Sequence, residues 1–83
     1  MPTACRICGL DDGAELYDAN GVPNYVICEC CGNESGIGDE NIGQVRELRG
    51  LWVGQGARWD SPKHRPEKWD FFQQIAQIPG DWR

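Results

Sequence analysis

Apolar residues recur at helical spacing directly after residue 41. The arc consists of four side chains: Ile42, Val45, Leu48 and Trp52. This spacing places them on one face of an α-helix. Asp39 or Asn41 can cap its start, and Gly54 and Gly56 are suited to its end. We therefore predict a helix here that buries its apolar face, even though Gly50 inside it lowers its helix propensity.

A second helical pattern lies near the end of the chain. It begins near Glu67, runs to Ile78 and is followed by Pro79-Gly80, which ends it. A proline-punctuated loop over residues 61–66 separates it from the first helix. The predicted apolar face consists of Phe71, Phe72, Ile75 and Ile78, and the predicted solvent face of Asp70, Gln73, Gln74 and Gln77.

The first half of the chain has short β-prone runs instead of a helical pattern. Leu16-Tyr17 and residues 25–27 flank Asn20-Gly21, which is a strong turn signal. Pro23 has no backbone N–H, so it limits the second strand to a sheet edge or a late start. The pattern predicts a short β-hairpin.

Two copies of the motif CxxCG enclose this predicted hairpin, and nineteen residues separate the last cysteine of the first pair from the first cysteine of the second. A two-residue gap lets one tight turn aim two thiolates at a single ion, and tetrahedral zinc takes four such ligands. The glycine after each pair, Gly9 or Gly32, can adopt the positive φ that closes the turn. The spacing predicts one structural zinc ion held by Cys5, Cys8, Cys28 and Cys31.

The same four cysteines would form two disulfides only in an oxidising compartment. The chain opens with MPTACRICG, which lacks the basic stretch and apolar core of a secretory signal. It also has no apolar run long enough to cross a bilayer. We therefore expect a soluble cytoplasmic protein without membrane contact. A chain of 83 residues buries only about 60% of its unfolded surface, so the metal would be its main source of stability.

Charge is distributed unevenly along the chain. Up to Asn41 there is one basic residue, Arg6, against eight acidic ones, whereas residues 42–83 carry seven basic and five acidic residues. The formal net charge is −5, and zinc held by four thiolates makes it more negative still. A nucleic-acid-binding ribbon would be expected to carry lysine and arginine on its cysteine half. The distribution therefore argues against binding to nucleic acid.

Catalysis would depend on Cys30, the cysteine outside the two CxxC pairs. Superimposing the two motifs places it where the first motif has Ile7, so we expect a small buried side chain that binds no metal. Two alternatives stay open: exchange with Cys31 as the ligand, and a reactive thiol beside the metal. The sole histidine, His64, lies in a proline-bounded loop and is expected to face solvent. No catalytic set remains, and we expect that the chain is not an enzyme.

Four tryptophans give the chain both core and surface candidates. Trp52 and Trp59 are expected to pack in the core. Trp69 and Trp82 fall off the predicted apolar face or beyond the helix, so partial exposure is expected. An exposed tryptophan beside cations is typical of protein interfaces. We predict a partner-binding site made of Trp69, Lys68 and Arg65, the alternative being a tail folded back onto the domain.

A series of landmarks follows the tandem pair Cys30-Cys31: Arg49-Gly50-Leu51-Trp52, Gly56-Ala57-Arg58-Trp59 and Pro66-Glu67-Lys68-Trp69. In this order, over residues 5 to about 78, the chain resembles the small bacterial cysteine-rich CPCC proteins. It departs from their namesake motif at Glu29, which replaces the proline and leaves the thiolates unchanged. The resemblance implies a zinc-binding family without an established activity. Some relatives look like companions of bacterial toxins, which implies an immunity or inhibitor role.

We therefore predict an α+β fold in which a zinc ribbon, made of two CxxCG knuckles and a short β-hairpin, is followed by two packed α-helices. It forms a single domain over residues 1–83, with the ribbon in residues 1–38, the two-helix segment in residues 39–78 and a tail in residues 79–83. We expect a structural-zinc module that binds another protein, as an inhibitor or immunity protein of a bacterial toxin would. The alternatives are a nucleic-acid or transcription-linked zinc-ribbon binder and a thiol redox protein acting through Cys30.

Overall fold

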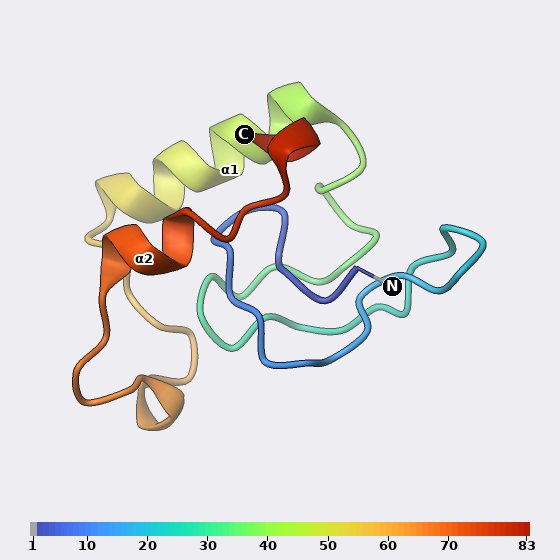
Figure 1. Ribbon diagram of the computed structural model, residues 1–83. Helices are drawn as coiled ribbons and strands as arrows, with labels where there is room; N and C mark the ends of the chain where they lie inside the picture. Colours follow the sequence, from blue (N-terminus) through green and yellow to red (C-terminus); the bar gives the residue numbers. More distant parts are fainter. Residues whose placement is uncertain (1) are drawn as a thin grey trace.

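The computed structural model describes residues 2–83, and its helices all lie in the second half of the chain. They are α1 (Ile42–Gly54), the 3-10 helix η1 (Pro62–His64), α2 (Phe71–Ile75) and the 3-10 helix η2 (Gly80–Trp82). Figure 1 shows the loops of the first half on one side of α1, with α2 near the C-terminal end of α1 and η2 near its start. Each helix within residues 2–83 is too short or too polar to span a membrane.

The predicted first helix is confirmed as α1. Asn41 is the residue that caps its start, because its side chain accepts a hydrogen bond from the Gln44 N–H at 3.2 Å. Val45 and Trp52 are buried on the predicted arc. Gly50 lies within the helix and faces open space, so it costs helix propensity without disturbing the packing.

Glycine ends α1 through a motif that satisfies its last carbonyls. Gly56 has φ +95°, a conformation in which a side chain would be strained. The Ala57 N–H donates to the Trp52 carbonyl at 2.9 Å, and the Gly56 N–H donates to the Val53 carbonyl at 3.0 Å. This pair of bonds is the Schellman arrangement, and it turns the chain sharply away from the helix axis.

The predicted second helix is wrong in its extent. The helix α2 has only five residues. It begins at Phe71 because the Asp70 side chain caps it by accepting a hydrogen bond from the Gln73 N–H at 3.0 Å. Before this cap the chain makes a turn, closed by the Trp69 N–H and the Pro66 carbonyl at 3.2 Å. After Ile75 the backbone tightens into single turns. The hydrogen bonds of the turn and of the cap therefore decide where this helix begins, although apolar residues at helical spacing extend further along the chain.

The predicted faces of this helix are wrong at two positions. Phe72, expected in the core, is 80% exposed, whereas Gln74, expected in solvent, is only 7% exposed. A helix of five residues does not present one continuous apolar stripe, and its neighbours decide which side chain turns inward. The Gln74 amide is turned inward by hydrogen bonds to the cysteine region.

The predicted β-hairpin is reduced to a turn with little pairing. Tyr17 and Pro23 form an isolated antiparallel bridge, and the Asp18 N–H donates to the Val22 carbonyl across the expected Asn20-Gly21 turn. Residues 2–83 contain isolated bridges and no continuous strand. Tyr25 has φ +54°, which breaks the extended conformation that a second strand needs. The described part of the chain thus has two α-helices and little strand.

The core joins the cysteine loops to α1. Trp52 and Trp59 are buried as predicted, each with 7% of its surface exposed, and Trp82 is partly buried. Most of the remaining buried apolar side chains come from the two cysteine motifs and the loop between them: Cys5, Ile7, Cys8, Leu16, Tyr17, Cys28 and Cys30. The cysteine motifs therefore form the centre of the molecule and are not an appendage to a helical core.

Arg49 connects α1 to the first cysteine motif and to the C-terminal residues through hydrogen bonds. Its guanidinium donates to the carbonyls of Arg6 and Ile7, each at 2.7 Å, and to the carbonyl of Trp82. The carbonyls of Arg6 and Ile7 lie in the turn of the first cysteine motif, and the carbonyl of Trp82 lies at the end of η2. None of the three has a regular backbone partner there. One planar cation thus satisfies three acceptors from segments far apart in the sequence.

Arg49→Ala is expected to lower the free energy of unfolding by about 2–3 kcal/mol, because it leaves three carbonyls without their charged donor. Arg46→Ala is the matched control: Arg46 is on the same helix, is exposed and reaches only the carbonyl of Arg83. It should cost about 0.5 kcal/mol or less. Urea unfolding of both variants measures the difference, and equal losses would refute the connecting role of Arg49.

A buried tyrosine and a buried aspartate close the loop before α1. The Tyr17 hydroxyl donates to Asp39 Oδ1 at 2.6 Å, and the same oxygen accepts the Gly36 N–H at 2.8 Å. Burial, followed by the hydrogen bond and the negative charge of Asp39, raises the pKa of Tyr17 to about 12. The raised pKa means that the folded chain prefers the neutral phenol.

Tyr17→Phe is expected to cost about 1.5–3 kcal/mol near neutral pH, because a hydrogen bond to a charged group is lost. The contribution of Tyr17 is present below the ordinary tyrosine pKa of 10 and is lost as the pH rises towards 12. The difference in urea midpoint between wild type and variant should therefore shrink over that interval. A difference that stays constant from pH 7 to pH 12 would contradict the assignment.

Candidate metal centre

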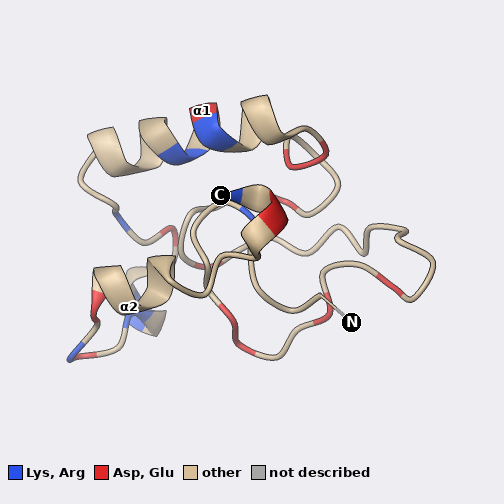
Figure 2. Ribbon diagram, turned by 45° about the horizontal axis from the view of Figure 1, so that its top comes forward, with Lys and Arg blue, Asp and Glu red and all other residues tan. Residues whose placement is uncertain are grey.

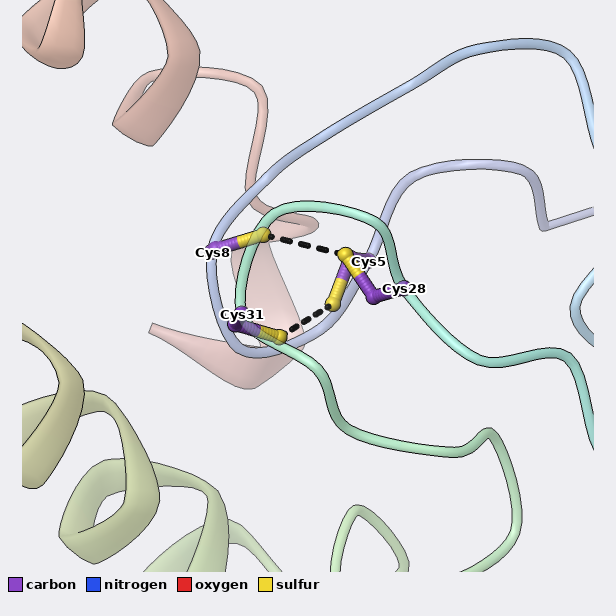
Figure 3. A group of neighbouring side chains, drawn as sticks. All are labelled: Cys5, Cys8, Cys28 and Cys31. Carbon is purple, nitrogen blue, oxygen red and sulfur yellow. Dashed lines mark hydrogen bonds between the residues drawn. The ribbon is translucent and has the colours of Figure 1, made fainter. Parts of the chain in front are cut away.

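Four cysteine sulfurs converge inside the core. The Sγ atoms of Cys5, Cys8, Cys28 and Cys31 all lie within 4.8 Å of one another. Figure 3 shows two separate loops of the chain pointing these side chains at a common point. Three of the four residues are buried and Cys31 is partly exposed. The four cysteines lie close enough to bind one metal ion.

The two CxxCG motifs fold in the same way. In the first, the Gly9 N–H donates to the Cys5 carbonyl, and in the second the Gly32 N–H donates to the Cys28 carbonyl, both at 2.9 Å. Each motif is also closed by an antiparallel bridge between the residue before its first cysteine and the residue two after its glycine. Gly9 and Gly32 have φ values of +84° and +78°. The repeated motif thus encodes a repeated turn.

Gly9 has a second role, because α2 approaches it closely. A Cβ atom placed on Gly9 would lie 2.2 Å from the Gln74 carbonyl oxygen. No real Cβ tolerates such a separation from a backbone atom. The absence of a side chain at Gly9 therefore permits both the turn and the contact with α2.

The distances between sulfurs fit a tetrahedral metal site better than disulfides. Cys8 Sγ lies 3.5 Å from Cys28 Sγ, and Cys5 Sγ lies 3.7 Å from Cys31 Sγ. A tetrahedron with metal–sulfur bonds of about 2.3 Å has sulfurs about 3.8 Å apart. A disulfide brings its sulfurs to about 2.05 Å. The four thiols are free, and their spacing and soft donor atoms suit zinc.

Hydrogen bonds among the thiols shift the pKa values of Cys5, Cys8 and Cys31. Hydrogen bonding with the Cys28 sulfur is the largest influence: it lowers the pKa of Cys5 and raises the pKa values of Cys8 and Cys31. Sulfurs this close share protons, since four adjacent thiolates would repel one another. A divalent cation among them supplies the compensating charge. The geometry and the charge requirement point to the same kind of ligand.

Cys30 lies beside this group and is not part of it. Its side chain is fully buried, as predicted, and its sulfur is 3.3 Å from Gln74 Nε2. The structure therefore gives Cys30 a polar neighbour and no access to solvent. That Cys30 is chemically inert stays a prediction, and a reactive thiol stays the alternative. His64 is exposed, as expected, with Nδ1 3.2 Å from Glu29 Oε1.

Gln74 connects the cysteine group to the rest of the molecule, and the sequence did not indicate it. Its Nε2 donates to the Cys8 carbonyl at 3.1 Å as well as to Cys30 Sγ, and its Oε1 accepts the Trp69 indole N–H at 2.7 Å. Helical periodicity predicts Gln74 on the solvent face, because the predicted helix is longer than α2. The sequence carries no other signal for this role.

The residues predicted to bind a partner lie together, outside the cysteine group. Trp69 is partly buried and makes edge-to-face contact with Trp59, with ring centroids 5.6 Å apart. The Arg65 guanidinium lies 5.3 Å from the Trp69 ring centroid, and Lys68 is exposed. One side of Trp69 thus belongs to the core. A partner role for these three residues stays a prediction.

Comparisons with models of known protein families, with curated proteins and with solved structures found no match to this chain. The resemblance to the CPCC proteins therefore stays a prediction that rests on the order of residues in the sequence.

Proposed function

We propose that the chain binds one zinc ion through Cys5, Cys8, Cys28 and Cys31, and that this ion holds a ribbon-like centre on which α1 and α2 pack. The observation that carries the proposal is the convergence of the four sulfurs from two similarly folded motifs, at separations close to those of a tetrahedral site. Four protein ligands leave no open position for a substrate. The metal is therefore assigned a structural role.

We further propose that the metal-held domain binds another protein and is not an enzyme. Its support is a surface on which Trp69 is flanked by Arg65 and Lys68, which is the combination that protein interfaces use as anchors. Figure 2 shows acidic residues along the loops of the first half, and Lys and Arg on α1 and near η1 and α2. The two regions differ in charge, and the second combines Arg65 and Lys68 with the half-buried Trp69.

The resemblance to the CPCC proteins adds the class of partner. We propose a bacterial toxin, which the chain would inhibit, because some relatives in that group look like toxin companions. An inhibitor needs a stable surface and no catalytic residues of its own. This assignment rests on the resemblance, whereas the zinc site rests on the geometry of the cysteines.

Titration of zinc into the reduced, metal-free chain tests the metal role. We expect circular dichroism and tryptophan fluorescence to change together and to saturate at one equivalent of zinc, because binding and folding are coupled. Cobalt should bind at the same stoichiometry and produce the visible absorption of a tetrahedral thiolate site. Folding that is complete before metal is added would contradict the proposal.

A further inference from the structure

A groove lies within the segment between α1 and α2, which carries η1. Its volume is about 360 Å³, within the range of about 300–1,000 Å³ typical of ligand pockets. Trp59, Trp69 and Pro62 supply apolar walls, while Arg58 and Arg65 supply charge. It is large enough for a few side chains of a bound peptide and too small to enclose a folded partner.

The two arginines of the groove are free to bind an anion. Arg58 and Arg65 are exposed, and neither side chain makes an ion pair or donates a hydrogen bond within residues 2–83. Asp60, the acidic residue nearest in sequence to Arg58, is directed elsewhere: its carboxylate lies where a Cβ on Gly32 would meet it at 3.0 Å. Glu67, two residues after Arg65, is exposed and does not line the groove. The groove therefore has positive charge that no carboxylate of its lining neutralises.

The groove is held in place by the core and by the second cysteine motif. The Trp52 indole N–H donates to the Arg58 carbonyl at 2.9 Å, which fixes the backbone of one rim. The Asp60 and Ser61 N–H groups donate to the Cys30 and Glu29 carbonyls, both at 2.9 Å. Trp69 is fixed in turn by its hydrogen bond to Gln74. These walls are therefore ordered before any ligand arrives, which lowers the entropic cost of binding.

We propose that this groove binds an acidic peptide segment of a partner protein, with a carboxylate between Arg58 and Arg65 and an adjacent apolar side chain against Trp59 and Trp69. The inference rests on the proposed interaction role and gives that role a specific surface. This surface includes the predicted partner-binding residues Trp69 and Arg65, and it also includes Arg58 and Trp59. Arginine binds carboxylates through two parallel hydrogen bonds, which makes it suited to this task. The apolar walls supply the burial that a pair of surface charges alone would lack.

A single-stranded nucleic acid also combines anionic and stacking groups. Two features favour the peptide. The groove offers two arginines, not a basic track along which a backbone could run. The whole chain carries a formal charge of −5, which repels a long polyanion more strongly than a short acidic segment.

The test uses fluorescence anisotropy with three labelled probes at physiological salt: a short peptide of alternating glutamate and leucine, the same peptide with glutamine for glutamate, and a short oligothymidine. The zinc-loaded chain should bind the glutamate peptide in preference to both others. The double variant Arg58→Gln, Arg65→Gln should weaken that binding about tenfold or more. Lys63→Gln, on the same loop and outside the lining, should change it by less than about twofold.

Three results would overturn the groove assignment: equal binding of the glutamate and glutamine peptides, tighter binding of oligothymidine, or unchanged binding by a double variant that still folds and holds its zinc. A second experiment captures partner proteins from the native cell. It distinguishes a wrong groove assignment from a wrong interaction role. If wild type and double variant capture the same protein equally, the groove assignment is wrong and the interaction role stands. If neither the peptide nor any protein is bound, the interaction role itself is wrong.

Discussion

Cys28→Ser is expected to abolish tight zinc binding and, with it, the folded state. Cys28 is buried, and its sulfur lies 3.5 Å from that of Cys8 within the group of four. A structural zinc contributes on the order of 10 kcal/mol or more of binding free energy, whereas small domains are stable by about 5–15 kcal/mol in total. A hydroxyl in place of one thiolate opens the site at the centre of the core. The variant should show a circular dichroism spectrum of an unfolded chain at neutral pH.

Cys30→Ala provides the matched control from the same motif. Cys30 is as deeply buried as Cys8, but its sulfur lies outside the group of four, so the zinc should be retained. The Gln74 amide keeps the Cys8 carbonyl as an acceptor when the sulfur is gone. We expect a loss of about 1–2 kcal/mol from the missing side chain. If Cys30→Ala loses its metal as fully as Cys28→Ser does, then Cys30 is a metal ligand and the proposed set of four is wrong.

Trp52→Ala is expected to cost about 3–5 kcal/mol, the second largest effect of a single substitution, because it removes a large aromatic side chain from the core. Trp52 is 7% exposed and packs against Phe71, with ring centroids 5.8 Å apart. Its indole N–H also donates to the Arg58 carbonyl. The substitution therefore removes an aromatic contact between α1 and α2 and a hydrogen bond to the loop that follows α1. Urea unfolding of the zinc-loaded protein measures the loss.

Trp69→Ala is the matched comparison on the surface. Trp69 is only partly buried, although it contacts Trp59 and donates a hydrogen bond to Gln74. We expect the variant to stay folded with a loss of about 1–2 kcal/mol and to bind its partner much more weakly. If Trp69→Ala unfolds the chain as badly as Trp52→Ala does, then Trp69 is a core residue and the proposed interface lacks its anchor.

Features that depend on local sequence could be predicted. The start and end of α1 follow from Asn41 and Gly56, whose effects act within one helical turn. The group of four cysteines follows from the two-residue gap in each motif, because each turn presents its pair whatever surrounds it. Two short repeated segments are therefore sufficient to predict the cysteine group at the centre of the molecule.

Features that depend on contacts between distant segments could not be predicted. Arg49 meets the carbonyls of Arg6 and Trp82 only after the loops have folded around α1. Gln74 turns inward because α2 is short and lies against Gly9. The extended pairing expected around Asn20-Gly21 fails because Tyr25 leaves the extended conformation. Neither periodicity nor propensity carries information about these three outcomes.

The central claim is that one zinc ion is held by four thiolates. The most direct test is to measure the metal content and to count the reactive thiols of the protein purified without added metal. We predict one zinc per chain and protection of all five thiols from alkylation, four by the metal and Cys30 by burial. All five should become exposed when a strong chelator removes the metal. The chain should unfold in the same step. A folded protein with much less than one metal per chain and with disulfides among Cys5, Cys8, Cys28 and Cys31 would contradict the account.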